Sequence, residues 1–178
     1  MSVYKKENPE YLRASLESIL VQTRTADEIL LIEDGPLTQE LYQVVAEYQK
    51  KCDYLHVHAM EQNVQLGRAL AKGVELCQYD LIARMDTDDI AMPDRLEKEE
   101  AYMEAHPEVD VVGGAIREFN DEGTIDRVKN MPKTQEEILE YVKVRNPLNH
   151  MTVMYRKDSI LTVSYTHLRA HETVLDLV

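Results

Sequence analysis

The sequence has no tryptophan, one phenylalanine, two cysteines and no long apolar run. Cys52 and Cys77 are too few for a disulfide framework and lack CxxC spacing, so we expect reduced thiols in a cytoplasmic protein. No run of about 18 apolar residues predicts a membrane-spanning helix. Basic residues are also few, with 20 Lys and Arg against 33 Asp and Glu and a net charge of −13. This balance argues against nucleic acid as a partner, because its backbone requires a basic surface.

What the sequence does have is a regular alternation of short apolar runs with amphipathic stretches. Its 178 residues suit one α/β domain. Asn8 and Pro9 mark the start of the first helix, as N-cap and first helical residue. Alternation from residue 1 to about 119 is typical of a parallel sheet covered by helices. Strands are expected over 1–6, 27–35, 54–60, 79–86, 109–119 and 150–156, and helices over 8–22, 38–51, 66–77, 93–105 and 134–144.

Acidic residues gather where two of the expected strands end. Glu33 and Asp34 follow the second strand, and Asp86, Asp88 and Asp89 follow the fourth. Two carboxylates about 4 Å apart repel by about 1 kcal/mol in water and about 4 kcal/mol at an effective dielectric near 20. Solvent, a helix N-terminus, basic side chains or a divalent cation must offset this repulsion. Because ligands of open α/β sheets bind beyond the carboxyl ends of strands, these acids are candidate site residues.

Four kinds of site place acids at such positions. An EF-hand loop beginning at Asp86 requires glycine where Ala91 stands, and a dinucleotide-binding domain requires a glycine-rich turn where "SVYKKENPEYL" has none. A phospho-receiver domain, a regulatory switch that binds Mg²⁺, matches "ILLIEDG" and "DLIARMDTDDIAMPD", but no lysine ends the fifth strand. A nucleotide-sugar transferase holds a diphosphate through a divalent cation, which suits an acidic protein. The transferase is favoured, and the receiver-like domain stays as the alternative.

Six segments, in order, resemble those of family-2 glycosyltransferases of the GT-A fold and the bacterial polysaccharide-synthesis type. They are "SVYKKENPEYLRASLESILVQT", "EILLIEDGP", "NVQLGRALAKG", "ARMDTDDIAMPDRLEKE", "VDVVGGAI" and "RNPLNHMTVMYRK". The resemblance implies a Rossmann-like α/β fold with a mostly parallel sheet, helices on both faces and an incomplete C-terminus. It also implies metal-dependent, inverting transfer of a sugar from a nucleotide sugar, expected to be a UDP-sugar, to a saccharide or lipid-linked saccharide acceptor.

The same resemblance assigns site residues by position. Those expected to bind the nucleotide sugar are Val3, Tyr4, Glu7, Asp34, Asn63, Arg68, Arg84, Asp86, Gly114 and His150. Asp88, with Asp86 and Asp89, is expected to hold Mn²⁺ or Mg²⁺, the hard ions that carboxylate oxygens prefer. Asp34 is expected to bond the base, and Asp86 the ribose and sugar side. Gln65 stands where this family usually has glycine, which puts the tightness of that turn in question.

The C-terminal part departs from the family pattern. From about residue 163, "SYTHLRAHET" resembles a translated sequencing adapter, so we expect a domain over 1–161 and a non-native tail over 162–178. The family's general base, usually an aspartate beyond "TVMYRK", has no counterpart before that tail. The catalytic residue is therefore unassigned, and this chain is expected to be inactive. The lipid-linked acceptors of this branch imply a place at the inner face of the cell membrane, with peripheral association through parts outside this chain.

Overall fold

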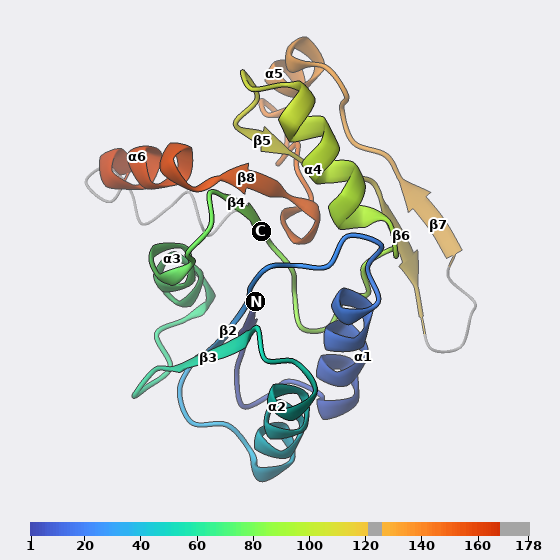
Figure 1. Cartoon of the computed structure of the whole chain (residues 1–178). Helices are drawn as coiled ribbons and strands as arrows, with labels where there is room; N and C mark the ends of the chain where they lie inside the picture. Colours follow the sequence, from blue (N-terminus) through green and yellow to red (C-terminus); the bar gives the residue numbers. More distant parts are fainter. Residues whose placement is uncertain (121–125, 168–178) are drawn as a thin grey trace.

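The computed structural model describes residues 1–120 and 126–167. Strands and helices alternate up to β5, as predicted (Figure 1). The described strands are β1 (Ser2–Val3), β2 (Ile29–Glu33), β3 (Leu55–Ala59), β4 (Leu81–Ala83), β5 (Val111–Val112), β6 (Ile116–Phe119), β7 (Asp126–Lys129) and β8 (Met154–Arg156). The helices are α1 (Pro9–Leu20), α2 (Gln39–Lys51), α3 (Leu66–Leu76), α4 (Arg95–Ala105), α5 (Gln135–Tyr141) and α6 (Lys157–His167), with a 3₁₀ turn at His150–Thr152.

The first three strands form a parallel sheet in the order β1–β2–β3. β2 pairs with β3 along its whole length, from Ile29 opposite Leu55 to Glu33 opposite Ala59. β1 pairs only with the far end of β2, where Val3 lies opposite Glu33. Because the strands are parallel, their carboxyl ends lie at one edge. The segments that follow these strands therefore leave the sheet together, which is where the predicted site begins.

A second sheet has the order β4–β8–β5, and β8 is antiparallel to both of its neighbours. β4 and β5 thus run in the same direction, as the alternation predicts, but a strand from much later in the chain separates them. The single strand predicted over 109–119 is wrong, because it divides at Gly113 and Gly114 into β5 and β6, and β6 pairs with β7. A Cβ on Gly113 would lie 3.2 Å from Leu148 Cδ2, so the Leu148 side chain packs closely against this break.

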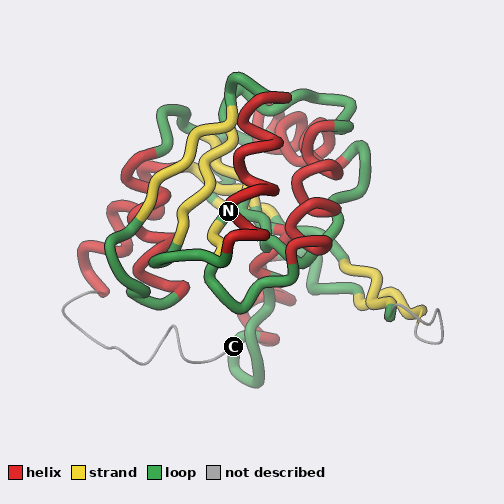
Figure 2. Tube along the Cα trace, turned by 90° about the horizontal axis from the view of Figure 1, so that it is seen from below, coloured by secondary structure: helices red, strands yellow, loops and turns green. Residues whose placement is uncertain are grey.

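Helices lie on both sides of the strands (Figure 2), as expected for the fold class. α1 begins as predicted, since Pro9 is its first residue and the Asn8 side chain accepts a hydrogen bond from the Glu10 backbone N–H at 2.9 Å. The main core joins α1, α2 and the first sheet, and its most deeply buried members include Val3, Leu12, Leu16, Leu31 and Leu41. Burial of each such side chain contributes about 1.5–3 kcal/mol.

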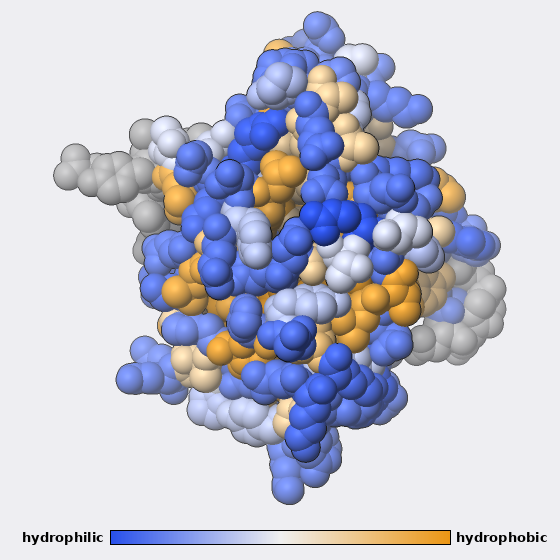
Figure 3. Space-filling model, in the orientation of Figure 1, coloured by the Kyte–Doolittle hydropathy of each residue, from blue (hydrophilic) through white to orange (hydrophobic). Residues whose placement is uncertain are grey.

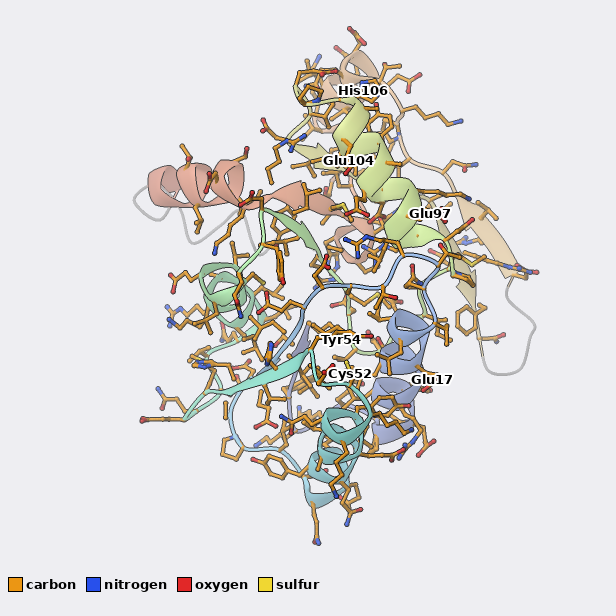
Figure 4. All side chains as sticks on the ribbon, viewed as in Figure 1. Glu17, Cys52, Tyr54, Glu97, Glu104 and His106 are labelled. Atoms are coloured by element: carbon orange, nitrogen blue, oxygen red, sulfur yellow. The ribbon has the colours of Figure 1, made fainter. Side chains whose placement is uncertain are left out.

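Polar contacts also join the two helices α1 and α2. Tyr48 of α2 is buried in the core, and its hydroxyl donates a hydrogen bond at 3.0 Å to Glu17 of α1, which is labelled in Figure 4. The face of the molecule in Figure 3 is mostly hydrophilic, with small apolar patches. Of the helices in the described part of the chain, none combines the length and apolarity needed to cross a membrane.

A cavity of about 300 Å³ lies between the two sheets. Leu30 of β2 lines one side and residues 81–83 of β4 line the other. Among the described residues around it there is none that the sequence assigns to the site. The cavity is therefore separate from the predicted nucleotide-sugar site.

The C-terminal end of the described chain is α6, which continues past residue 161, where the sequence predicts that the natural domain ends. Residues 168–178 of the predicted tail lie outside the described residues, as does the segment 121–125. The domain boundary at residue 161 therefore stays a prediction.

Candidate functional site

The acidic residues that follow β4 come together in the structure. One carboxylate oxygen each from Asp86, Asp88 and Asp89 lies within 4.8 Å of the others. Asp88 is exposed, and the other two are half-buried. Burial, followed by the charges of Asp86 and Asp88, raises the pKa of Asp89 to about 6. The cluster thus concentrates negative charge that a divalent cation would neutralise.

The loop that carries these acids is fixed by polar side chains from α1. Ser15 Oγ donates a hydrogen bond to the Asp86 carbonyl at 2.8 Å, and Ser18 Oγ accepts one from the Ala91 N–H at 3.0 Å. Gln22, just after the helix, donates to a later carbonyl of the same loop at 2.7 Å. All three side chains are buried. Since buried polar groups need partners, these bonds hold the loop backbone in one conformation.

Two basic side chains lie against Asp86. Arg84 follows β4 directly, is buried, and pairs its guanidinium with the Asp86 carboxylate. Among the described residues, Arg84 Nη2 has no hydrogen-bond partner. His150 Nδ1 lies 3.7 Å from the Asp86 carboxylate. Burial is the main cause that lowers the pKa of His150, and the positive charge of Arg84 lowers it further. The negative charge of Asp86 opposes this shift but does not reverse it, so the neutral imidazole is favoured.

A cleft of about 420 Å³ runs from the acid cluster across the ends of β1 and β2. Its lining residues are Ser2, Tyr4, Glu7, Asp34, Asn63, Gln65, Leu66, Asp86, Thr87, Asp88 and His150. The structure thus brings together seven predicted site residues: Tyr4, Glu7, Asp34, Asn63, Asp86, Asp88 and His150. Segments far apart in the sequence meet here, at the edge where ligands of α/β sheets bind. The predicted residues outside the lining are Val3, Arg68, Arg84, Asp89 and Gly114.

Val3, Arg68 and Gly114 lie outside the cleft lining, each in a different part of the fold. Val3 is fully buried, and its carbonyl accepts a hydrogen bond from the Asp34 N–H at 2.8 Å. Arg68 is exposed on α3. The backbone N–H of Gly114 donates to Thr152 Oγ1 at 2.9 Å, which ties the chain after β5 to the 3₁₀ turn. The donor-binding assignments of all three stay predictions.

Asp34 organises the part of the cleft at the end of β2. It is only 4% exposed; its Oδ1 accepts from the Val64 N–H at 2.6 Å, and its Oδ2 accepts from Asn63 Nδ2 at 2.9 Å. The next residue, Gly35, has φ +83°, and a Cβ there would lie 2.5 Å from the Asn63 backbone nitrogen. This contact requires glycine. Each carboxylate oxygen has a second lone pair, so Asp34 can still accept a hydrogen bond from a ligand.

Gln65 lies in the same part of the cleft, directly before α3, with φ 73° and ψ 153°. Among the non-glycine residues that the structure describes, it is the one with positive φ. Side chains rarely adopt this region, and the cost is about 1–3 kcal/mol. The turn therefore has the backbone conformation that glycine favours, although glutamine occupies the position.

Residues that support the site from behind were missed by the sequence analysis. Ser15, Ser18 and Gln22 recur at helical spacing beside the apolar stripe of α1, and such a polar stripe indicates a buried polar partner. Thr87 Oγ1 donates to Glu7 Oε2 at 2.7 Å, and both residues line the cleft. This residue lies between the predicted acids, but spacing alone does not predict its contact.

Comparison with known proteins gives a family match. The chain matches the family model described as Glycosyl transferase family 2 over residues 1–166. It is 43% identical over 168 residues to the amylovoran biosynthesis glycosyltransferase AmsE of Erwinia amylovora, covering 94% of this chain and 62% of that protein. It is 34% identical over 169 residues to the UDP-Gal:alpha-D-GlcNAc-diphosphoundecaprenol beta-1,3-galactosyltransferase of Escherichia coli, covering 92% and 59%. The chain thus spans about three fifths of these relatives.

Solved structures support the fold. S. aureus TarS 1-349 in complex with UDP-GlcNAc has a TM-score of 0.69 at 19% identity, over 92% of this chain and 46% of that one. The mannosyltransferase PcManGT from Pyrobaculum calidifontis, in complex with GDP-Man and Mn2+, has a TM-score of 0.66 at 12% identity, over 91% and 45%. These likenesses confirm the predicted GT-A fold, and the family match favours the transferase over the receiver-like alternative. By the match over residues 1–166, the chain belongs to glycosyltransferase family 2.

Proposed function

We propose that the cleft binds a nucleotide sugar with Mn²⁺ or Mg²⁺, and that the chain, as part of a glycosyltransferase, passes the sugar to a hydroxyl of a saccharide acceptor. The observation that carries this proposal is the convergence of three carboxylates beside a cleft whose other side is formed by Asp34 and Asn63. A nucleoside diphosphate has the matching chemistry, because its base needs hydrogen-bond acceptors and its phosphates need cations. AmsE, named for amylovoran biosynthesis, supports a role in polysaccharide synthesis.

The nucleoside lies, in this proposal, on the side of the cleft formed by Asp34. The Asp34 carboxylate is held by Asn63 and Val64 and keeps free lone pairs for the N–H of a base. Tyr4 lines the same cleft and is 42% exposed, so its ring is available for stacking on the base. Uracil is the proposed base, supported by the UDP-GlcNAc complex of TarS and by the E. coli relative named for UDP-Gal.

The acid cluster has the donor atoms that a hard divalent cation prefers. Carboxylate oxygens suit Mg²⁺ and Mn²⁺, and here three of them lie within 4.8 Å of one another. Asp88 is the proposed main ligand because it is exposed and lines the cleft, with Asp86 and Asp89 beside it. When bound, the cation supplies positive charge that stabilises the departing diphosphate. The Mn2+ complex of PcManGT supports this assignment.

Asp86 lines the cleft between two basic side chains. Arg84 holds its carboxylate from the buried side, and His150 faces it at 3.7 Å. We assign Asp86 to the ribose and sugar, with the neutral imidazole of His150 as a further hydrogen-bonding group. The acceptor hydroxyl would attack the anomeric carbon as the bond to the diphosphate breaks, which inverts the configuration. This step requires a general base, and we assign none among the described residues.

The proposed acceptor is a saccharide carried on a lipid diphosphate. The E. coli relative is named for a diphosphoundecaprenol-linked acceptor, and it shares 34% identity with this chain. An acceptor anchored in this way would place the reaction at the inner face of the cell membrane. Peripheral association of the protein with that membrane forms part of the same proposal.

Isothermal titration calorimetry with UDP in the presence of Mn²⁺ tests the proposed function. Heat of binding is expected with Mn²⁺ for the wild-type chain, and Asp88→Asn should abolish the metal-dependent part. The fold should survive, because the substitution removes one charge from a repulsive cluster. Asp94→Asn is the matched control, since Asp94 is the N-cap of α4, pairs with Lys98 of that helix and does not line the cleft. A folded sample that gives no heat with UDP, GDP or ADP would contradict the proposal.

A further inference from the structure

The guanidinium of Arg95, the first residue of α4, joins two strand ends beneath the acid cluster. Its Nη2 donates to the Arg84 carbonyl at 2.8 Å and lies 3.5 Å from the Val153 carbonyl. The Arg84 N–H also donates to the Val153 carbonyl, at 2.8 Å. Arg84 follows β4 directly, and Val153 directly precedes β8. Arg95 is therefore positioned where the two segments leave the sheet together.

Each of these strand ends leads to one side of the cleft. Asp86 is two residues after Arg84, and His150 is three residues before Val153. The Asp86 carboxylate and His150 Nδ1 are 3.7 Å apart. We call the loop that carries Asp86, Asp88 and Asp89 the acid loop, and the residues from His150 to Val153 the His150 segment. The distance between them thus depends on how the backbone is held at Arg84 and Val153.

Arg95 is itself held in place by Glu99, one turn along α4. Arg95 Nε donates to Glu99 Oε1 at 3.0 Å, and both side chains are only 10% exposed. Glu99 Oε2 has no partner among the described residues, and burial raises the pKa of this carboxyl. Apolar side chains of similar volume are often neutral or more stable than a buried ion pair. Stability alone therefore does not account for a charged pair at this position.

We propose that Arg95, oriented by Glu99, is a positioning residue that holds the acid loop and the His150 segment at the separation that the donor requires. This inference rests on the proposed function. A metal site needs its ligands within about 0.5 Å of the productive geometry, so a loop that is free to shift would bind metal and nucleotide less tightly. Loss of a group that orients metal ligands typically weakens metal affinity by about 10–100-fold.

The test compares two arginines that both pair with glutamates of α4. Arg95→Met removes the proposed positioning group. Arg24→Met is the control, because Arg24 binds Glu100 at 2.7 Å and 3.1 Å, and its other hydrogen bonds within the described residues go to Asp27 and the Thr25 carbonyl rather than to the strand ends. Arg95→Lys keeps the charge beside Glu99 but lacks the planar fork by which one nitrogen binds Glu99 and another binds the strand-end carbonyls. Mn²⁺ and UDP affinities are measured by calorimetry well below the melting temperature of each variant.

Arg95→Met is expected to bind Mn²⁺ and UDP about 10–100-fold more weakly, and Arg95→Lys several-fold more weakly. Arg24→Met should lower the melting temperature without changing either affinity. Binding by Arg95→Met within about two-fold of wild type, or an equal loss in Arg24→Met, would overturn the inference. If Arg95→Met does not fold, unchanged affinity in Arg95→Lys would overturn it instead. Absence of binding in the wild type would be the separate failure of the proposed function.

Discussion

Replacement of Gln65 by glycine should stabilise this protein, although most substitutions destabilise. Gln65 has φ 73° and ψ 153° at the N-cap of α3, and its side chain makes no capping hydrogen bond. A side chain in this region of backbone space costs about 1–3 kcal/mol, because Cβ crowds the neighbouring peptide groups. Glycine removes that cost, and it is also a better N-cap than an uncapped long side chain.

The gain is reduced by the greater freedom of glycine in the unfolded chain, which costs about 0.5–1 kcal/mol. The net increase in the free energy of unfolding is therefore about 0.5–2 kcal/mol. For a chain of 178 residues, each kcal/mol raises the melting temperature by about 2–4 °C. Urea denaturation followed by circular dichroism measures this difference directly.

Gln65→Ala is the matched control for this experiment. Alanine keeps Cβ and therefore the backbone strain, so its free energy of unfolding should stay within about 0.5 kcal/mol of wild type. If glycine and alanine destabilise the protein alike, Gln65 does not hold the left-handed conformation and the reasoning is refuted.

Three further substitutions concern residues that lie near the cleft or pack behind it. Gly35→Ala should cost at least about 2 kcal/mol, because φ is +83° and the new Cβ would lie 2.5 Å from the Asn63 backbone nitrogen. Gly73→Ala is the control, because its new Cβ would make an ordinary contact with Ile32 Cγ1 at 3.4 Å; it should be neutral or stabilise the protein by up to about 1 kcal/mol. Equal melting temperatures for Gly35→Ala and Gly73→Ala would count against this account. Ser15→Ala should cost about 1–2 kcal/mol in urea denaturation, because the Asp86 carbonyl loses a buried donor at 2.8 Å; an unchanged midpoint would show that the loop does not depend on that bond.

The sequence predicts those parts of the fold that local chemistry determines. Asn8 and Pro9 start α1 as expected, because capping depends only on neighbouring residues. The acids Asp34, Asp86 and Asp88 line one cleft, as their positions after the second and fourth expected strands predict. The family and the GT-A fold follow from motifs in the correct order.

Long-range pairings could not be predicted in the same way. Nothing local to residues 154–156 indicates that β8 inserts between β4 and β5, since strand order depends on contacts across the whole chain. Arg95 and Glu99 show helical spacing, but that spacing does not tell which strand ends they face. The sequence leaves Arg84 open between the acid cluster and the donor; the structure pairs its guanidinium with Asp86, and its contact with the donor stays a prediction.

The most direct test of the central claim is whether metal and nucleotide bind to the acid cluster together. Electron paramagnetic resonance of Mn²⁺ reports the free ion, and it can be recorded for the protein alone, UDP alone and both together. By linkage, each ligand must raise the affinity of the other by the same factor. We predict that protein and UDP together remove more free Mn²⁺ than the sum of their separate effects, and that Asp88→Asn abolishes this excess. Free Mn²⁺ equal to that sum in the wild-type chain would contradict the account.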